Sequence, residues 1–266
     1  ELAKLIQKQH AGSSEERKLS TVDFGKEILL DPSIRPETAL RPDVSQNPES
    51  ILLTGATGFL GIYLLDQLLR QTSAKLYCLI RESANGLHRI ETKMKAHKLW
   101  RDEYRDRLLI VEGDFALPGL GINAETWAQL SQGIDAIYHN GAWVNHAYPY
   151  EAMKAVNVQG TIELLRLATR CKVKDFNYVS TYSVISDKER SVTCQKEILK
   201  FVQEVEHGYS QAKWVTEQHI KEAGARGLPV RIFRPSGISG HTGTGIFNPD
   251  DFINNVLKGC SQLDKT

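Results

Sequence analysis

Cysteine is scarce in this sequence: its 266 residues include four, at positions 78, 171, 194 and 260. They form no C-x-x-C motif and no dense framework, which excludes a small disulfide-stapled domain and favours reduced thiols in a cytoplasmic protein. No apolar run approaches 18 residues, and the N-terminal residues lack the h-region of a signal peptide, so we expect no membrane contact.

A charge excess of either sign is also missing. Thirty-three Lys and Arg residues balance 32 Asp and Glu residues, which leaves a formal net charge of +1. Because nucleic acids and anionic membranes are recognised by a basic excess, neither is an expected partner. A chain of this length buries about 70–75% of its unfolded surface. It therefore needs neither disulfides nor a metal ion to fold, and we predict no metal site.

The first fifty residues differ in composition from the rest of the chain. Residues 1–10 begin as an amphipathic helix whose Leu2, Leu5 and Ile6 share one face. Since no nearby segment could cover that face, we interpret it as the tail of a helix from a preceding domain. Residues 11–50 contain four prolines among Ser and Glu, which is typical of a linker. A strap lying across the following domain is the alternative.

From residue 51 onward, short apolar strands alternate with helices. We expect strands at 51–54, 76–80, 108–111, 135–139, 176–180 and 230–233, and helices at 59–71, 88–100, 150–169 and 209–223. Unbroken apolar strands separated by helices indicate a parallel sheet that is covered on both faces. The predicted fold class is therefore α/β, a doubly wound parallel sheet, in a domain spanning residues 51–240.

A glycine-rich turn, TGATGFLG, connects the first predicted strand to the first predicted helix. In such a motif one glycine permits the tight turn, one lets the backbone approach a pyrophosphate, and one allows close packing of helix on strand. The helix N-terminus adds unbonded N–H groups and a positive dipole for the phosphates. Because the motif lies between a strand and a helix, it predicts a dinucleotide site formed by Gly55, Thr57, Gly58, Phe59, Leu60 and Gly61.

The residues after the second strand indicate whether NAD or NADP binds. An acidic residue there would accept hydrogen bonds from the ribose 2′-OH of NAD, whereas an arginine suits the 2′-phosphate of NADP. The sequence has Arg81 followed by Glu82, and Arg89, one turn into the next helix, could provide a second guanidinium. Since the planar donor fork of arginine matches phosphate, we expect NADP(H), although Glu82 leaves NAD as the alternative.

Further cofactor contacts are predicted after the third and fourth strands. Asp114 follows the third strand, where its carboxylate can accept the adenine amino group and Phe115 lies beside it; a helix cap or turn is the alternative role for Asp114. After the fourth strand, small residues let the chain pass beside the cofactor riboses at Asn140, Gly141 and Ala142. Asn157 is interpreted as a buried structural amide rather than a reactive group.

Tyr-x-x-x-Lys places two side chains on one helix face, one turn apart. A lysine ammonium there would lower the phenol pKa from about 10 and hold the nicotinamide ribose, so that the tyrosine exchanges a proton near neutral pH. The motif occurs as Tyr150/Lys154 and as Tyr209/Lys213. Ligands in such sheets lie beyond the carboxyl ends of the strands, where the fifth strand delivers hydroxyls next to the second pair. We therefore predict that the second pair is catalytic and that the first lies on the surface.

Three hydroxyls after the fifth strand are candidates to hydrogen-bond a substrate carbonyl: Ser180, Thr181 and Ser183. Strand alternation can present only some of them to the crevice, and we choose Thr181. In the reducing direction a reduced nicotinamide would deliver hydride to the carbonyl carbon while Tyr209 protonates the oxygen. Thr181 would polarise that oxygen, and Lys213 would hold the ribose.

These motifs resemble those of the extended short-chain dehydrogenase/reductases, a Rossmann-fold superfamily. TGATGFLG, HNGAWVN, VST, YSQAKW and RPSGISG stand in the expected order. More narrowly, LIRES, EGDFALPGLGI, GYSQAKWVTE and GTGIFNPDDF resemble the terminal thioester reductase domains of nonribosomal peptide and polyketide synthetases, over residues 50–262. Those domains are related to carboxylic acid reductases and fatty acyl reductases.

The resemblance implies a reaction and its residues. In that family a carrier protein presents a phosphopantetheine thioester, and hydride from NADPH gives a hemithioacetal that collapses to an aldehyde, which is sometimes reduced again to the alcohol. Matched position by position, the family's catalytic set falls on Thr181, Tyr209 and Lys213, and its 2′-phosphate arginine on Arg81. Its nicotinamide-contacting segment falls on Pro235, Ser236 and Gly237. The N-terminal ELAKLIQ resembles the last helix of a carrier domain, which makes an upstream acyl or peptidyl carrier the expected partner.

The sequence departs from the family pattern at its C-terminal end. Family members continue past RPSGISG with a mostly helical substrate subdomain, and residues 241–266 resemble the start of it. From this we expect a chain that binds NADP(H) and is inactive alone on its natural substrate. A basic stretch at 88–107 could attract an acidic carrier domain, although its interleaved acids and histidines favour a solvated helix face.

Two other functions stay open. One is that of another extended short-chain dehydrogenase/reductase, such as a fatty acyl reductase or a nucleotide-sugar epimerase or dehydratase. LIRES and EGDFALPGLGI argue against it by resemblance. The other is a non-catalytic NADP(H)-binding module, against which the retention of Tyr209 and Lys213 beside Thr181 counts.

Overall fold

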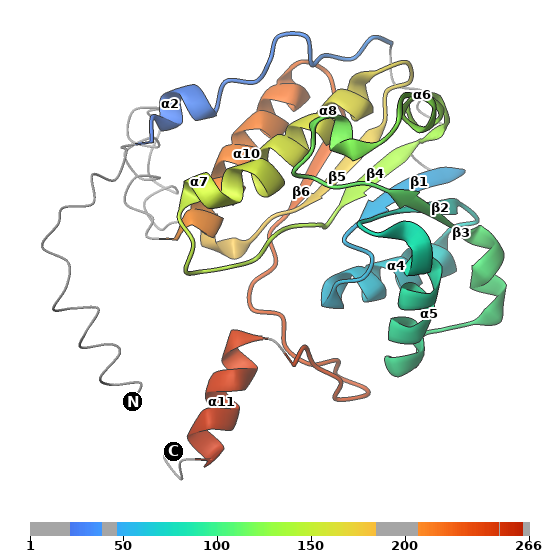
Figure 1. Cartoon of the computed structure of the whole chain (residues 1–266), viewed down its shortest axis with the longest axis vertical. Helices are drawn as coiled ribbons and strands as arrows, with labels where there is room; N and C mark the ends of the chain where they lie inside the picture. The colour runs from blue at the N-terminus through green and yellow to red at the C-terminus, as the bar shows by residue number, and fades with distance from the viewer. Residues whose placement is uncertain (1–21, 39–46, 185–206, 250, 263–266) are drawn as a thin grey trace, which may run out of the picture.

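The computed structural model describes residues 22–38, 47–184, 207–249 and 251–262. Its centre is one parallel sheet of six strands: β1 (Ser50–Thr54), β2 (Lys75–Ile80), β3 (Leu108–Glu112), β4 (Ala136–His139), β5 (Asp175–Val179) and β6 (Val230–Phe233). The strand order is β3-β2-β1-β4-β5-β6 (Figure 1). Because the order reverses between β1 and β4, the loops after these two strands part and leave a crevice. The predicted fold class, a doubly wound Rossmann-type sheet, is confirmed.

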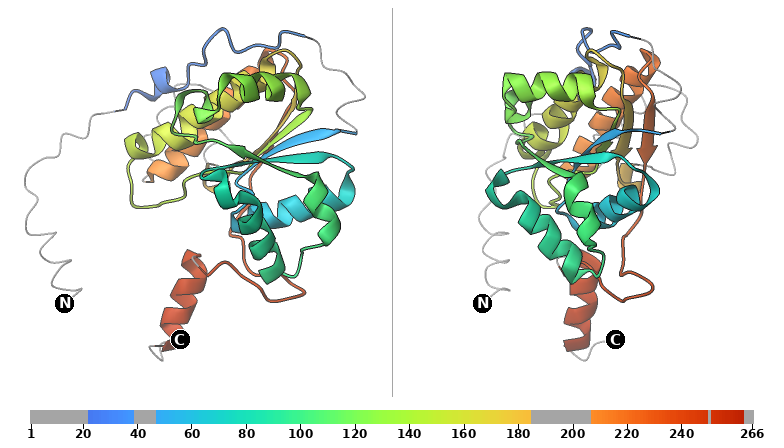
Figure 2. Two further views of the ribbon diagram at one scale, coloured as in Figure 1. Left: turned by 45° about the vertical axis from the view of Figure 1, so that its right-hand side comes forward. Right: turned by 90° about the vertical axis from the view of Figure 1, so that its right-hand side faces the viewer.

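Helices cover both faces of the sheet (Figures 1 and 2). On one face lie α4 (Phe59–Gln71) and α5 (Gly86–Ala96), and on the other α6 (Ala124–Gly133), α8 (Gly160–Thr169) and α10 (Gly208–Ala225). In β1, Ile51 and Leu53 face the first layer and Leu52 the second, and all three are fully buried. This burial on both faces is why the strands read as unbroken apolar runs. In the described part of the chain, no helix is both long and apolar enough to cross a membrane.

Some helical segments differ from the sequence expectation. The helix expected at 88–100 ends at Ala96, because the chain turns at Lys98, whose φ is +59°. The helix expected at 150–169 is helical throughout, but it begins as α7 (Tyr150–Met153), widens into a π-helical turn (Lys154–Gln159) and continues as α8. The helices α6 and α11 (Phe252–Gln262) were not anticipated.

Residues 22–38, here named the strap, pack on the helix layer of α7, α8 and α10 (Figure 1). They include the short helix α2 (Phe24–Glu27), and Phe24, Leu30 and Ile34 are at most 5% exposed. Arg226, at the end of α10, donates to three backbone carbonyls of the strap. The acids of the strap form the pairs Glu27–Lys154, Asp31–Arg166 and Glu37–Arg170. The helix expected within 1–10 lies outside the described residues.

Candidate active site

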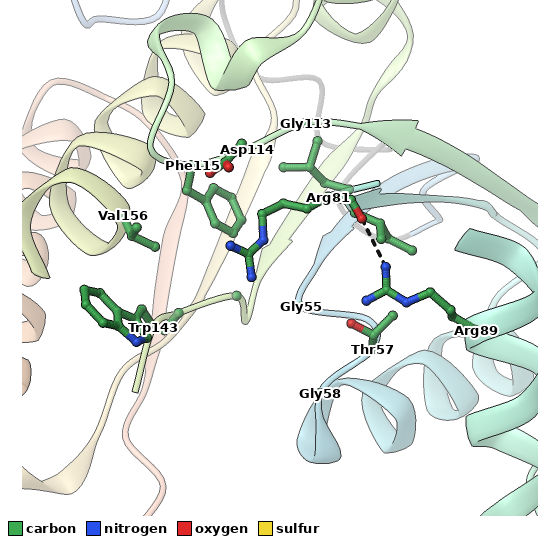
Figure 3. Close-up of a pocket in the computed structure, with 14 residues that line it drawn as sticks. Gly55, Thr57, Gly58, Arg81, Arg89, Gly113, Asp114, Phe115, Trp143 and Val156 are labelled. Carbon is green, nitrogen blue, oxygen red and sulfur yellow. Dashed lines mark hydrogen bonds between the residues drawn. The ribbon is translucent and has the colours of Figure 1, made fainter. Parts of the chain in front are cut away.

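Two adjoining cavities open at the carboxyl ends of the strands and form one groove, here named the cleft. The first has a volume of about 550 Å³ (Figure 3) and the second a volume of about 400 Å³. Gly55 and Gly58 after β1, and Gly141 and Ala142 after β4, line both cavities. The cleft therefore lies at the crevice where the strand order reverses, the position at which sheets of this kind bind ligands.

The turn after β1 can take its shape only because its key positions are glycines. Gly55 has a φ of +70°, and a Cβ on it would lie 2.8 Å from the Cα of Gly141. A Cβ on Gly61 would lie 1.9 Å from the carbonyl oxygen of Gly55, so only glycine lets α4 begin this close to the turn. α4 has no side-chain cap and no acid in its first turn, so its N-terminal N–H groups can bind an anion. These features fit the pyrophosphate of a dinucleotide.

A buried hydrogen-bond network joins the turns after β1 and β4. Oγ1 of Thr54 accepts from the N–H of Gly141 at 2.9 Å and lies 2.8 Å from Nδ1 of His139. Nε2 of His139 lies 2.9 Å from Oγ1 of Thr161, whose hydroxyl donates to the carbonyl oxygen of Asn157 at 2.7 Å. Burial lowers the pKa of His139 well below its ordinary value, so the imidazole is neutral. The network fixes the floor of the cleft.

Asn157 holds the loop that follows β4. Its side chain is buried, and its amide pairs with both backbone groups of Trp143: Nδ2 donates to the carbonyl oxygen at 2.9 Å, and Oδ1 accepts from the N–H at 2.8 Å. This pairing is structural, as the sequence interpretation supposed. The π-helical turn that carries Asn157 thus places one wall of the cleft.

The first cavity ends between the loops after β2 and β3. Figure 3 shows the guanidinium of Arg81 extending over the cavity and that of Arg89 near Thr57. Nη1 of Arg89 donates to the carbonyl oxygen of Arg81 at 3.1 Å, which ties the two residues together. Glu82 has a φ of +58° and does not line the cavity. Asp114 does line it, and its Oδ1 also accepts from a backbone N–H two residues on, so it is a turn residue as well.

The second cavity brings the candidate catalytic residues together. Its lining includes Thr181, Tyr209, Lys213, Pro235, Ser236 and Gly237. Oγ1 of Thr181 lies 3.1 Å from Oγ of Ser183, which lies 2.9 Å from Oγ of Ser210. Ser180 also lines this cavity, whereas Ser183 does not. Of all the candidate cofactor residues, Gly61 alone lies outside the lining of the cleft, because its place is in the packing of α4 on the turn.

Burial, and not the neighbouring lysine, sets the pKa of Tyr209, which corrects the sequence expectation of a lowered value. Tyr209 is 9% exposed, and burial raises its pKa to about 12. Nζ of Lys213 donates to the carbonyl oxygen of Val179 at 2.7 Å and lies 4.5 Å from the centre of the Tyr178 ring and 5.9 Å from that of the Tyr209 ring. Burial lowers the pKa of Lys213 to about 7, despite the opposing effect of the Glu217 carboxylate.

Sequence reasoning missed three polar residues of the second cavity: His146, Asn248 and Asp251. The ring of His146 lies edge-on to that of Tyr209, with the ring centroids 5.8 Å apart. His146 directly follows HNGAWVN, so a wider reading of that motif would have included it. The other two stand in GTGIFNPDDF, which carried only the family resemblance.

Only half of the first Tyr-x-x-x-Lys pair lies on the surface as predicted: the Lys154 side chain is 37% exposed, whereas Tyr150 is buried, contrary to the prediction. Tyr150 is 2% exposed, and its phenol donates to Oε2 of Glu27 at 2.5 Å. Nζ of Lys154 donates to Oε1 of the same carboxylate at 2.7 Å. The strap supplies this partner from 123 positions earlier in the chain, a distance over which local sequence patterns carry no information.

Much of the basic stretch at 88–107 is engaged within the fold. Arg107 donates to the backbone carbonyls of Leu69, Thr72 and Ala74. Lys95 and Arg105 both pair with the carboxylate of Glu91. A carrier domain would therefore meet fewer unpaired cations here than the sequence suggests.

The model of an NAD-binding family described as "Male sterility protein" matches residues 53–266. The chain belongs to this family. This membership indicates that the domain binds a nicotinamide nucleotide, and together with the relatives named next it confirms the resemblance to thioester reductase domains.

Curated relatives of this male sterility family domain are parts of much longer proteins. The domain is 38% identical over 271 residues to one of the subunits of linear gramicidin synthase from Brevibacillus parabrevis, and 32% identical over 293 residues to L-2-aminoadipate reductase of Schizosaccharomyces pombe. These matches cover 99% and 98% of this chain, but 5% and 20% of the relatives.

Solved structures include a similar reductase domain and a more distant protein with the same fold. The terminal R domain from the myxalamid PKS-NRPS biosynthetic pathway is 43% identical, with a TM-score of 0.83 over 91% of this chain and 62% of that one. A UDP-glucuronic acid 4-epimerase from Bacillus cereus is 21% identical, with a TM-score of 0.56 over 81% of this chain and 64% of that one, and shares the fold alone.

Proposed function

We propose that this domain uses NADPH to reduce an acyl or peptidyl thioester held on a carrier protein and releases it as an aldehyde. The strongest support is the meeting of Thr181, Tyr209 and Lys213 in a cavity that continues into the glycine turn. The relatives support it too, since one belongs to a linear gramicidin synthase and one is named an L-2-aminoadipate reductase.

The lining of the first cavity supports NADP(H) over NAD. The guanidinium of Arg81 extends over the cavity while Glu82 lies outside its lining, which suits a 2′-phosphate better than a 2′-OH. Asp114 and Phe115 would contact the adenine, and the glycine turn the pyrophosphate. The ribose and nicotinamide would then lie against 140–142, Lys213 and 235–237, where the bound nicotinamide supplies the hydride.

The raised pKa of Tyr209 favours the reducing direction. A phenol with a pKa of about 12 holds its proton at neutral pH, so Tyr209 can donate that proton to an oxygen that gains negative charge. The hydroxyl of Thr181 donates a hydrogen bond to the same oxygen. A thioester whose carbonyl carbon gains hydride and whose oxygen gains this proton becomes a hemithioacetal. Cleavage of its C–S bond then releases the carrier thiol and leaves the aldehyde.

An acyl or peptidyl carrier domain with a phosphopantetheine arm is the proposed partner. One solved relative, 28% identical to this chain, is a thiolation-reductase di-domain from an archaeal non-ribosomal peptide synthetase. The apolar side chains of Val144 and Ile238 line the second cavity and are exposed. An acyl chain or the arm itself would cover them.

Turnover of thioesters tests the proposal. An acyl-pantetheine and an acyl-carrier thioester are offered to this chain and to the longest protein that contains it, and NADPH absorbance is followed. The longer protein should oxidise NADPH and form an aldehyde, whereas this chain alone should bind NADPH without turnover. Turnover of a UDP-sugar by the longer protein would support an epimerase-like enzyme, and NADPH binding by the longer protein without any turnover would support a non-catalytic module.

Tyr209→Phe tests the assigned proton donor. We expect kcat to fall at least a hundredfold, roughly the contribution of a general acid, while the Kd for NADPH stays within about twofold. Stopped assays and fluorescence titration measure the two quantities. An unchanged kcat would remove Tyr209 from the reaction.

A further inference from the structure

The strap and the candidate proton donor pack in one hydrophobic cluster. Phe24 of the strap, Tyr150 of α7 and Tyr209 of α10 all belong to it, and they are 4%, 2% and 9% exposed. The rings of Phe24 and Tyr150 meet edge to face with their centroids 5.2 Å apart. A segment N-terminal to the whole sheet thus contributes to the packing around Tyr209.

Glu27 ties the strap to the α7 segment through both of its carboxylate oxygens. Its Oε2 accepts from the phenol of Tyr150 at 2.5 Å and its Oε1 from Nζ of Lys154 at 2.7 Å, and its side chain is 18% exposed. Burial acts to raise the pKa of Glu27, but the hydrogen bonds from Lys154 and Tyr150 outweigh it and hold the pKa below its ordinary value. The carboxylate is therefore ionised and doubly bonded at neutral pH.

α7 in turn touches α10 at the turn that carries Tyr209. α7 is the N-terminal turn of a helical run that continues through the π-helical turn into α8, and its N-terminal end is held by its contacts with the strap and with α10. Gly208 packs directly on the backbone of Pro149 and Tyr150, and a Cβ on it would lie 2.4 Å from the nitrogen of Tyr150. Because no side chain separates the two backbones, a displacement of Tyr150 moves the first turn of α10 as well.

We propose that Glu27 is a positioning residue for Tyr209: by holding Tyr150 and Lys154 it fixes α7 against Gly208, and so sets where the Tyr209 phenol lies in the cleft. Only the kinetic consequence of this inference rests on the proposed function. The hydrogen bonds of the strap from Glu27 to Ile34 go to the helix layer of α7, α8 and α10, whereas Arg81 and the glycine turn lie after β2 and β1, so a change at Glu27 should alter the reacting geometry without altering cofactor affinity.

Two matched substitutions within the strap test the inference. Glu27→Gln keeps the size of the side chain but removes the charge and one of the two acceptors. Glu37→Gln is the control, because Glu37 is a strap acid held at the far end from α7 by Arg170 at 2.7 Å and the N–H of Cys171 at 2.8 Å. We expect Glu27→Gln to lower kcat about tenfold with the KM for NADPH within about twofold, and Glu37→Gln to change neither.

Tyr150→Phe supplies a second variant that removes a single hydroxyl and keeps the ring in the cluster. It should also lower kcat, and it should have little further effect in the Glu27→Gln background, because both changes break the same hydrogen bond. Fully additive effects of the two changes would contradict the proposed connection. If Glu27→Gln fails to fold, Tyr150→Phe against Glu37→Gln makes the same comparison.

Amide hydrogen exchange keeps the test independent of turnover. The first hydrogen-bonded amides of α10, from Gln211 onward, should exchange about tenfold faster in Glu27→Gln than in the wild type, while α4 is unchanged. A wild type that reduces no thioester would refute the proposed function, and the exchange would still decide on Glu27. Unchanged exchange and kcat in Glu27→Gln would overturn the inference, as would an equal fall in kcat for Glu27→Gln and Glu37→Gln.

Discussion

Tyr209 and Lys213 lie one turn apart on α10, and burial shifts their pKa values in opposite directions, to about 12 and about 7. The common cause is that a dry environment disfavours the charged form, which is the phenolate of one residue and the ammonium of the other. Above pH 7 both side chains are therefore mainly neutral before any ligand enters. We expect the hydroxyl and phosphate groups of a bound dinucleotide to raise the pKa of Lys213 again, so that the side chain takes up a proton.

Proton uptake on cofactor binding checks this at the level of one residue. A pKa of about 7 leaves Lys213 mainly deprotonated at pH 8, and binding of the anionic NADPH raises that pKa again. We expect binding at pH 8 to take up close to one proton, measured by calorimetry in two buffers of different ionisation enthalpy. Lys213→Met should abolish the uptake. If the wild type and Lys213→Met took up the same number of protons, a group other than Lys213 would be the one that is protonated.

Our proposal of NADP(H) over NAD depends on Arg81. Loss of a charge-assisted bond to a 2′-phosphate costs roughly 1.5–3 kcal/mol, so Arg81→Ala should weaken NADPH binding by about ten- to a hundredfold. NADH binding should change by less than about threefold, as measured by fluorescence titration. Equal losses for both dinucleotides would favour a role for Arg81 in shaping the loop, and would reopen NAD as the cofactor.

At the scale of elements, the turn between β1 and α4 leaves no room for a methyl group. Gly61→Ala would put a Cβ 1.9 Å from the carbonyl oxygen of Gly55 and force the two apart. We expect it to lower the free energy of unfolding by about 1–3 kcal/mol and NADPH affinity by more than about tenfold. Urea denaturation and titration measure both.

The control for this change is Gly133→Ala, at the end of α6. A Cβ there meets no atom within 4 Å, so stability and NADPH affinity should stay close to those of the wild type. If Gly61→Ala behaved like Gly133→Ala, the close approach of α4 to the turn would have no importance for binding.

The strands, the glycine turn and α4 could be predicted because their signals are local: apolar runs, glycines at fixed spacing and a 3.6-residue period. A local signal for α6 was also present and was missed, since the side chain of Asn123 caps the helix by accepting from the N–H of Thr126. The π-helical turn inside the predicted helix 150–169 had no such signal. It carries Asn157, whose side chain bonds the backbone of Trp143, fourteen positions away.

At the scale of the whole molecule, the features that escaped prediction are those set by packing between distant segments. The burial of Tyr150 depends on the strap, and the raised pKa of Tyr209 depends on the cluster that encloses it. The candidate site residues nevertheless line one cleft, because in a parallel sheet every strand delivers its next residue to the same edge. The strand order brings the candidate residues to one place, and the burial of each side chain sets its protonation state.

Stability against acid should reflect the buried histidines. Burial lowers the pKa of His219 to about 4 and that of His139 well below its ordinary value. In the unfolded chain a histidine takes up a proton as the pH falls through about 6.5, whereas these two stay neutral in the fold. Their contribution to the free energy of unfolding is therefore fully present above about pH 6.5 and is lost as the pH falls toward about 4. His219 alone should contribute about 2 kcal/mol of loss at pH 5.

Urea denaturation at pH 7 and pH 5 measures this dependence. His219→Gln should make the loss of stability on acidification smaller, because one of the titrating groups is gone. His88→Gln, at an exposed position on α5, should leave the loss as in the wild type. An equal pH dependence in all three proteins would mean that His219 is protonated to the same extent in the folded and unfolded states.

The network beneath the cleft has a direction. Thr161 gives its hydrogen to the carbonyl of Asn157, so its oxygen accepts from Nε2 of His139, and that nitrogen carries the ring hydrogen. Nδ1 is then a bare acceptor for the hydroxyl of Thr54, whose oxygen receives the N–H of Gly141. The imidazole of His139 is thus held in one tautomer. A ligand that hydrogen-bonds the Gly141 amide would weaken the bond from that amide to Thr54 and so shift the nitrogen NMR signals of the His139 ring, although the ligand does not contact His139.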